Sequence, residues 1–303
     1  KCTYCFNHFF RNLPDEKTNY IRRRSVGHVI EELRMNKDRY KLKRIEFWDD
    51  IFTFDKKWLK EFLDVYKREI ALPFRCYIHV SCFDEDIAKW LKEAGCKWVD
   101  FGIQSINENY RRNVLKRFDK NEDIVKAINL LKKYRIVSFA DYIIGLPGDS
   151  KEHFEQARLF FIENKPNNIE PYFMSYLPHT EILETALSLN VLDEKDIDLV
   201  NNGTFPHNYF SCSFAIQDKR FYENYYFIFK VLPATPNFLK KKIDYKFVNR
   251  IPGYVKRIFE LGATLYLGFK YKNIRVRYIL NSYPKHFIRI VKIKCSTKRN
   301  IHE

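Results

Sequence analysis

Residues 136–164 read IVSFADYIIGLPGDSKEHFEQARLFFIEN, and this stretch decides the fold. The segment Ile136–Gly145 is rich in β-branched and aromatic residues and predicts a buried strand. The turn-forming letters GLPGD follow, and Ser150 is a favourable residue for the start of a helix. Lys151–Asn164 then carries apolar side chains at helical spacing. Strand, turn and amphipathic helix in this order predict one unit of a parallel α/β sheet.

The same rhythm occurs throughout the first 204 residues. Four more strands are predicted at Arg44–Trp48, Arg75–Val80, Lys97–Ile103 and Asn168–Tyr176. Four more helices are predicted at Ser25–Asn36, Asp55–Glu69, Asp84–Ala94 and Asn121–Tyr134. Parallel strands need right-handed crossovers through such helices. Because a helix precedes the first of the five strands, we expect a sixth strand before Lys1, so the fold class is a partial (β/α)6 TIM-type barrel with its first strand missing.

The positive charge is concentrated in the last third of the chain. The 303 residues have a formal net charge of +16. From Phe205 onward, 20 Lys and Arg stand against 5 Asp and Glu, which leaves a net charge of about +1 for the first 204 residues. This asymmetry predicts two regions: a core barrel at 1–204 and a basic, aromatic-rich, mainly helical region at 205–303 with a break near Pro233–Pro236.

Composition narrows the class of protein. Hydrophobic residues make up 46% of the chain, with 9 Gly and 11 Pro, which is typical of a folded globular protein. Seven irregularly spaced cysteines do not form a disulfide framework, so a reducing cytoplasm is expected. Neither a signal peptide nor a spanning apolar run is recognisable, so we expect neither export nor insertion across a membrane.

Chemically reactive residues follow the strands. In parallel sheets of this kind, functional loops lie after the carboxyl ends of the strands. The loops in question contain CTYC before the first visible helix, and then WDDIF, SCFDED, QSINEN, GLPGDS and LPHTEI. Cysteines, paired aspartates, a Gln-Ser pair and a Gly-Pro turn are therefore expected to converge on one rim.

These loops resemble those of radical S-adenosylmethionine (SAM) enzymes. The family motif is C-x3-C-x2-C, and KCTYC supplies its last two cysteines; the first would stand four residues before Cys2, upstream of this sequence. Further similar segments occur in order: FWDDIFTFD, KEAGCKWVDFGIQSINENYRRNVLKR, YIIGLPGDSKEHF and SYLPHTEIL. Together they cover about Lys1–Leu189, and they are most similar to the branch that carries a cobalamin-binding domain before the barrel. His179 stands where such relatives favour Gly, so the backbone of that loop is expected to differ.

The resemblance implies two cofactors, a 4Fe-4S cluster and SAM, and possible cobalamin through an upstream domain. Cys2 and Cys5 match two of the three cluster ligands, and thiolates are the usual ligands of such clusters. SAM would occupy the open iron and be cleaved reductively to a 5′-deoxyadenosyl radical. Tyr4 matches an aromatic position close to the adenine. Asp49 and Asp50 match a polar or acidic turn that faces the methionine ammonium.

The remaining SAM contacts implied by the resemblance follow later strands. Gln104 and Ser105 match positions that meet the ribose hydroxyls or the amino acid end. Gly145, Pro147 and Gly148 match a loop where the backbone approaches the adenine, because side chains there would block it. No catalytic side chain is implied beyond these cofactor contacts.

Simpler interpretations remain open for each residue. Cys2, Cys5 and His8 with a distant fourth ligand could hold zinc, or the two cysteines could form a redox pair. Asp49 and Asp50 could cap a turn, Ser105 could cap a helix, and GLPGD could be a plain turn.

The other cysteines are not expected to bind metal. Cys76, Cys82 and Cys96 fit small core residues, because they lie in or beside predicted strands and a helix end. Cys212 and Cys295 lack partners at metal-ligand spacing.

The functional hypothesis is radical attack on an unactivated carbon of a small-molecule substrate, with methyl transfer or ring chemistry if cobalamin takes part. An electron donor such as flavodoxin or ferredoxin would be a partner. The alternatives are a cobalamin-free radical SAM enzyme acting on RNA, and a non-catalytic remnant or zinc-stabilised binding module. The basic C-terminal region could face nucleic acid or an anionic membrane surface, or it could be a solvated helical cap on the barrel.

Overall fold

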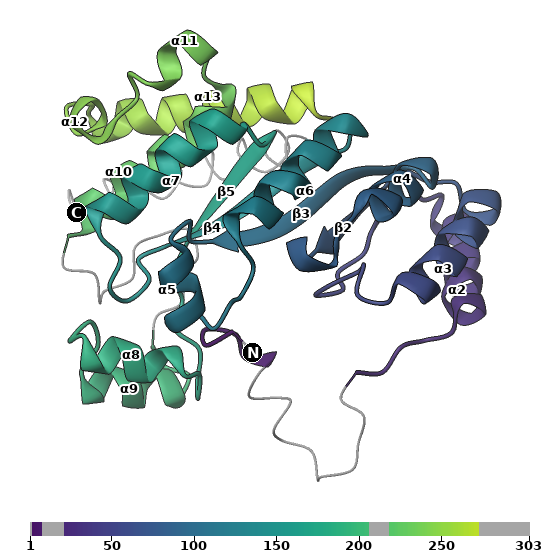
Figure 1. The fold of residues 1–303 in the computed structure, drawn as a ribbon, viewed down its shortest axis with the longest axis horizontal. Helices are drawn as coiled ribbons and strands as arrows, with labels where there is room; N and C mark the ends of the chain where they lie inside the picture. The colour runs from purple at the N-terminus through teal and green to yellow at the C-terminus, as the bar shows by residue number, and fades with distance from the viewer. Residues whose placement is uncertain (1, 8–20, 206–217, 273–303) are drawn as a thin grey trace, which may run out of the picture.

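Five parallel strands form the centre of the molecule. The computed structural model describes residues 2–7, 21–205 and 218–272. The strands lie in the order β1-β2-β3-β4-β5 and curl into an open half-barrel (Figure 1). Their bounds are β1 Ile45–Glu46, β2 Phe74–Ile78, β3 Cys96–Gln104, β4 Val137–Ile144 and β5 Asn168–Phe173. Neighbouring strands pair in parallel throughout, which confirms the partial barrel predicted from the sequence.

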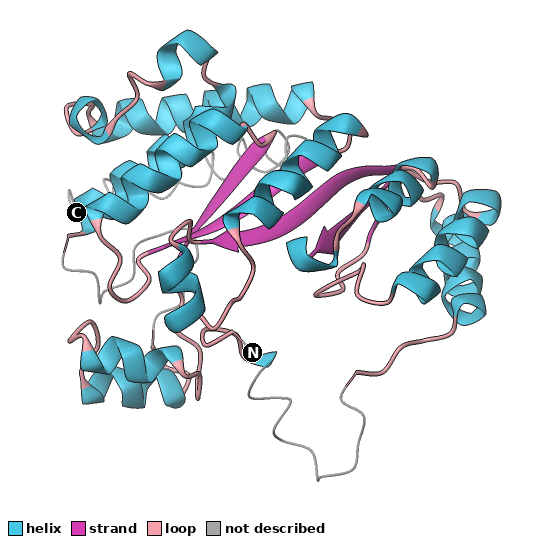
Figure 2. Cartoon of the chain, viewed as in Figure 1, coloured by secondary structure: helices cyan, strands magenta, loops and turns pink. Residues whose placement is uncertain are grey.

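Helices join successive strands (Figure 2). The five predicted ones are α2 Val26–Tyr40, α3 Lys56–Glu69, α4 Glu85–Glu93, α6 Asn121–Lys133 and α7 Lys151–Asn164. Ser25, Asp84 and Ser150 act as N-caps, because each side chain accepts a hydrogen bond from a backbone N–H of the first turn. Three short helices did not emerge from the sequence: α5 Glu108–Asn113, α8 Ile182–Ser188 and α9 Glu194–Asn201.

Two strands, β1 and β5, are each three residues shorter than predicted. β1 keeps only Ile45 and Glu46 of the stretch Arg44–Trp48, and β5 ends at Phe173 rather than Tyr176. The residues that follow β5 turn into a second, smaller core with α8 and α9, in which Met174 and Tyr176 are fully enclosed. The chain leaves the sheet early because these side chains pack against helices rather than against another strand.

The inner face of the sheet carries charged groups that are paired. Arg75 of β2 and Asp100 of β3 form a two-pronged ion pair in which both side chains are buried. The Arg75 guanidinium also lies 4.5 Å from the ring centre of Phe139 on β4. Nearer the edge, the Lys230 Nζ donates to Glu170 on β5 at 2.7 Å. The interior of the half-barrel is therefore cross-linked by charge as well as by apolar packing.

The C-terminal region packs directly against this sheet. Its helices are α10 Lys219–Val231, α11 Asn237–Lys240, α12 Tyr245–Val248 and α13 Gly253–Lys270, with a short 3-10 turn η2 at Leu232–Ala234. α10 covers the edge of β5, where Tyr226 stacks on Phe173 with ring centres 5.0 Å apart. On the neighbouring strand, Phe229 contacts Tyr142. A helix in this position covers a strand edge that would otherwise be open.

The described helices include none that is long and apolar enough to cross a membrane. The C-terminal region is mainly helical, as the sequence predicts, and the short elements η2, α11 and α12 lie between its two longer helices, α10 and α13. The break lies at Pro233–Pro236, as predicted, because η2 ends there and α11 begins after Pro236.

We expect Asp100→Ala to lower the free energy of unfolding by about 3–5 kcal/mol, because it removes the carboxylate from a buried guanidinium. Urea unfolding followed by circular dichroism measures this loss. The double change Arg75→Met with Asp100→Leu should recover part of it by replacing charge with apolar volume. An Asp100→Ala protein as stable as the wild type would show that this pair does not hold the strands together.

His179 adopts a φ of +56°, the left-handed conformation that Gly tolerates best. His179 thus holds a backbone conformation that Gly would adopt without strain. We predict that His179→Gly raises the free energy of unfolding by about 1 kcal/mol relative to His179→Ala, because only the former removes the strain of a Cβ at positive φ. Equal urea midpoints for the two variants would contradict this.

Candidate functional site at the carboxyl end of the sheet

A tight turn holds the two cysteines. The Cys5 N–H donates to the Cys2 carbonyl at 3.1 Å. Thr3, between them, is buried and fixed on two sides. Its N–H donates to the Leu115 carbonyl at 3.2 Å, and its hydroxyl donates to the Val114 carbonyl at 2.8 Å. Its own carbonyl accepts from the Ile182 N–H at 3.0 Å, at the start of α8. The cysteine turn is thus clamped between two distant segments.

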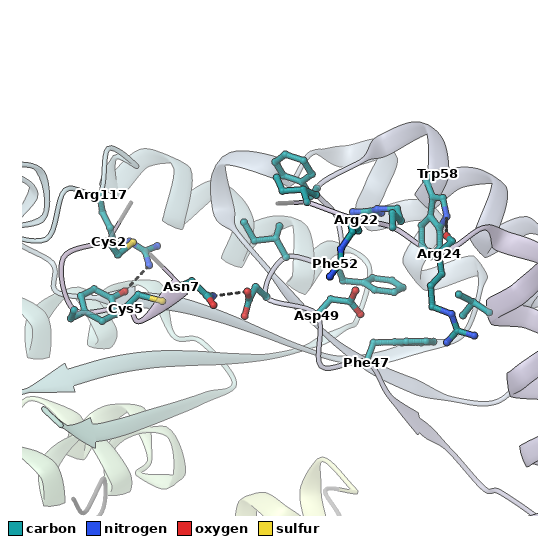
Figure 3. Close-up of a pocket in the computed structure, with 17 residues that line it drawn as sticks. Cys2, Cys5, Asn7, Arg22, Arg24, Phe47, Asp49, Phe52, Trp58 and Arg117 are labelled. Carbon is teal, nitrogen blue, oxygen red and sulfur yellow. Dashed lines mark hydrogen bonds between the residues drawn. The ribbon is translucent and has the colours of Figure 1, made fainter. Parts of the chain in front are cut away.

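Cys2 and Cys5 are free thiols on the wall of a pocket of about 870 Å³. Figure 3 shows the cysteine turn at one end of this pocket, Asp49 and Arg22 near the middle, and Arg24 with Trp58 at the other end. Burial raises the pKa of the Cys5 thiol. The pocket therefore joins soft sulfur donors to charged groups of both signs.

The predicted aspartates lie in this pocket. Asp49 and Asp50 follow β1, and both line the wall. The Asn7 Nδ2 donates to Asp50 Oδ2 at 2.7 Å, so the chain after the cysteine turn is tied to the acidic loop. The structure thereby brings together the cysteines and the acidic pair, which are far apart in sequence.

An arginine-rich segment forms the opposite wall, a feature the sequence study did not single out. Arg22, Arg23 and Arg24 all line the pocket. The Arg23 guanidinium lies 4.8 Å from the Trp58 ring centre, and the Trp58 indole N–H donates to the Arg24 carbonyl at 2.9 Å. Arg24 also forms an ion pair with Glu32. Stacking and pairing hold two of the three cations in place.

Arg117 is a second residue that sequence reasoning missed. Its guanidinium donates to the Tyr4 hydroxyl at 3.4 Å and to the Gly102 carbonyl of β3 at 2.9 Å. It also pairs with buried Asp119 at 3.2 Å and lies 3.3 Å from Nε2 of His79. A single buried side chain therefore connects the cysteine turn to the ends of β2 and β3.

His79 directly follows Ile78, the last residue of β2. Burial lowers its pKa, and the neighbouring positive charge of Arg117 lowers it further, although Asp119 acts in the opposite direction. A neutral imidazole can accept the Arg117 hydrogen bond, whereas an imidazolium cannot. The arrangement accordingly favours uncharged His79. The sequence placed His79 inside the predicted strand Arg75–Val80, whereas β2 ends at Ile78, so nothing in the sequence pointed to this residue.

A second pocket of about 400 Å³ lies on the inner face of β4 and β5. Tyr4 and Cys5 line both pockets, so the cysteine turn forms a shared wall. Burial raises the pKa of Tyr4, which keeps its hydroxyl protonated. The other polar residues that line this second pocket are Gln104, Asp141, Tyr172 and Ser175. Phe6, Phe173 and Met174 are among its apolar residues.

Gln104 is held in an unusual conformation. Its φ is +67°, and the pairing of β3 with β4 shifts register between Gly102 and Gln104. The side chain folds back over Gly102, where a Cβ would lie only 2.2 Å from the Gln104 amide nitrogen. Strain of this kind is often found at functional sites. Gly102 thus makes room for the amide that lines the second pocket.

Four predicted SAM contacts do not line either pocket. Ser105 is fully buried, and its hydroxyl accepts from the Asn107 N–H at 3.4 Å. Gly145, Pro147 and Gly148 form a turn closed by Asp149, whose carboxylate accepts from the Gly145 N–H at 3.2 Å. Their assigned role in binding SAM stays a prediction.

The donor set fits an iron–sulfur cluster in part. Two soft thiolates in one turn beside a roomy pocket suit such a cluster. Within the described ranges, no group of three His, Cys, Asp or Glu residues is placed to hold a metal ion, so the turn by itself offers two ligands. His8 of the zinc alternative lies outside the described residues, as do Cys212 and Cys295. Cys76 and Cys96 are buried as expected, but Cys82 is only half-buried.

The two cysteines, the two aspartates and the pocket of about 870 Å³ lie at the carboxyl end of a parallel half-barrel, where α/β-barrel proteins carry their functional sites. The sequence profile of the Radical SAM superfamily matches residues 1–161, and the chain belongs to that superfamily.

Its relatives include several methyltransferases. The chain is 30% identical over 169 residues to an uncharacterized methyltransferase of Pyrococcus horikoshii, a match covering 55% of this chain and 37% of that protein. It is 21% identical over 167 residues to a bacteriochlorophyllide d methyltransferase of Chlorobaculum tepidum, covering 54% and 35%. The chain thus spans little more than a third of the length of these curated relatives.

One solved structure shows the same fold. It is that of the radical SAM methyltransferase TsrM from Kitasatospora setae, with cobalamin and a 4Fe-4S cluster bound. The TM-score is 0.51 at 20% identity, over 60% of this chain and 36% of that one.

His79 should make stability depend on pH. Because its pKa is lowered on folding, the unfolded chain binds more protons below the ordinary histidine pKa of 6.5. Stability should therefore fall as the pH drops below that value and be unaffected by this group above it. We expect His79→Gln to lose less stability between about pH 7 and about pH 5 than the wild type, measured by urea unfolding.

The matched control is His28→Gln at an exposed position of α2, which should follow the wild-type profile. Parallel profiles for His79→Gln and the wild type would mean that His79 is not held neutral in the folded protein.

Proposed function

We propose that this chain is the catalytic barrel of a radical SAM methyltransferase that works with cobalamin. The observation that most directly supports this proposal is that Cys2 and Cys5 line a pocket that Asp49 and Asp50 also line. Similarity to two methyltransferases supports methyl transfer as the outcome. Cobalamin is bound in TsrM, which has the same fold, and this supports its inclusion in the proposal.

Cys2 and Cys5 would hold a 4Fe-4S cluster, together with a third thiolate from outside the described residues. When bound, the cluster supplies the electron that cleaves SAM reductively. The turn is suited to this task because Thr3 fixes its backbone on both sides. Arg117 donates to the Tyr4 hydroxyl and so holds the Tyr4 ring in place between the two cysteines of the turn.

The charged residues of the larger pocket would orient SAM. Asp49 and Asp50 carry carboxylates that can pair with the methionine ammonium, and Asn7 restricts Asp50. Arg22 on the opposite wall can meet a carboxylate. The amide of Gln104, in the adjoining pocket, offers both a donor and acceptors to ribose hydroxyls. Tyr4 is an aromatic surface between the two pockets.

The second pocket would receive the substrate carbon near this shared wall. Its apolar residues exclude water, and its polar residues can orient a small molecule. A flavodoxin or ferredoxin would deliver the electron.

The test uses the protein with the residues that precede Lys1 in its reading frame, reconstituted anaerobically with iron and sulfide. We expect about four irons per chain, and 5′-deoxyadenosine or methylated product from SAM with a strong reductant. Cys2→Ala and Cys5→Ala should lose both the iron and the turnover. Cys82→Ala should lose neither, because Cys82 lines neither pocket.

Binding of zinc with SAM left intact would contradict the radical proposal and favour the binding-module alternative. Hydroxocobalamin added during reconstitution should remain bound through gel filtration. If turnover occurs while cobalamin does not bind, the cobalamin-free alternative, for instance an enzyme acting on RNA, replaces the cobalamin-dependent one.

A further inference from the structure

The outer face of α13 is apolar and exposed. Five large side chains point away from the protein: Tyr254, Ile258, Phe259, Tyr266 and Phe269, which are 71%, 66%, 57%, 51% and 65% exposed. At 100° per residue they span an arc of about 140°. We call these five residues the α13 face. A contiguous exposed surface of this kind, unlike scattered single residues, indicates an interaction site.

The other side of α13 is used for packing. Ala263 and Leu267 are buried in contact with the rest of the protein. Glu260, the single acidic residue of this helix, is half-buried on that inward side, and burial raises the pKa of its carboxyl group. The α13 face therefore carries no charge of its own, and the negative charge of the helix is turned away from it.

Two cations flank the α13 face, in a region that is basic as a whole. Arg257 and Lys270 lie on either side of the apolar arc and are exposed. Between residues 232 and 272 the chain has nine Lys and Arg against two acidic residues, Asp244 and Glu260. An uncharged apolar arc with a basic surround has the composition of helices that lie in the surface of an anionic membrane.

The α13 face lies far from the cysteine turn. Tyr271, just after α13, accepts a hydrogen bond from the Trp98 indole at 2.9 Å and one from the Asn167 amide at 3.3 Å. Trp98 is near the start of β3, and Asn167 directly precedes β5. In Figure 1, α13 accordingly crosses the end of the molecule opposite to the N-terminus. A surface bound here would leave the pockets open.

We propose that the α13 face docks onto an anionic lipid surface. The apolar side chains would enter the boundary between headgroups and acyl chains, while the flanking cations would meet lipid phosphates and carboxylates. α13 would lie in the interface rather than cross it, because it has 18 residues and carries Lys256, Arg257 and Glu260 in its first half. This inference is independent of the proposed reaction.

Charge excludes two other occupants of the α13 face. A second copy of the chain would bring the same positive charge to the interface. Residues 273–303 contain eight Lys and Arg against a single acidic residue, Glu303, so they too are repelled by the basic surround. Nucleic acid matches the charge, and the aromatic rings could stack on unpaired bases, so binding of single-stranded RNA instead of vesicles is the competing outcome of the experiment below. Lipid satisfies both the charge and the apolar arc.

The experiment is sedimentation of the full chain with vesicles of phosphatidylcholine containing about a third phosphatidylserine, compared with pure phosphatidylcholine. The wild type should bind the anionic vesicles preferentially. Ile258→Glu with Phe269→Glu should weaken binding by about tenfold or more, because it removes apolar surface and adds repulsion. Both residues are exposed, so the fold should tolerate the change, which circular dichroism verifies.

The matched control is Met35→Glu with Leu159→Glu. It replaces two exposed apolar residues on other helices and changes the net charge by the same amount. It should weaken binding far less. Equal losses in the two double variants would mean that general charge attraction through the basic region suffices, and would overturn the proposal. The proposal would also be overturned if the wild-type protein stayed in the supernatant with both kinds of vesicle, whether or not it then bound single-stranded RNA or self-associated.

Discussion

The arrangement of the site depends on one buried guanidinium. Arg117 contacts Tyr4 of the cysteine turn, the Gly102 carbonyl of β3, the His79 ring after β2, and the Asp119 carboxylate. A planar group with several N–H donors can satisfy such a set at once, whereas Lys offers a point charge on a flexible stem. Because each partner belongs to a different element, the position of the cysteines relative to the sheet is set by how these elements converge on Arg117.

The half-barrel is also unusual in what it encloses. Its interior has charged residues such as Arg75, Asp100 and Glu170 where a closed barrel would hold branched apolar side chains. Burial of these groups is sustained only because they pair, and Lys230, which pairs with Glu170, comes from α10. The C-terminal region therefore completes the interior as well as covering an edge. The region thus has a structural role, which is to pair with Glu170 and to cover β5, in addition to its excess of positive charge.

Much of the fold follows from local sequence, because strands with β-branched runs and helices with good caps are specified within short windows. Cys2, Cys5, Asp49 and Asp50 could also be placed together, since the ends of parallel strands share one rim. Ser105 was expected beside Gln104 but lines neither pocket, because neighbouring residues of a strand point to opposite faces and Gln104 takes the pocket side. The roles of Arg117 and His79 were equally hidden. Both depend on tertiary contacts that no periodicity or motif encodes.

The clamp on Thr3 has a consequence for the way the protein is made. Its partners are at Val114, Leu115 and Ile182, so none of the contacts that fix the cysteine turn is local. During synthesis from the N-terminus, the thiols emerge first and the last of their supports emerges much later. Until α8 has left the ribosome, the segment that contains the two cysteines lacks the hydrogen bond from the Ile182 N–H that helps to fix it. Loading of a metal cluster would therefore come late in biogenesis, and the nascent chain would need protection from oxidation or from capture of other metals in the interval.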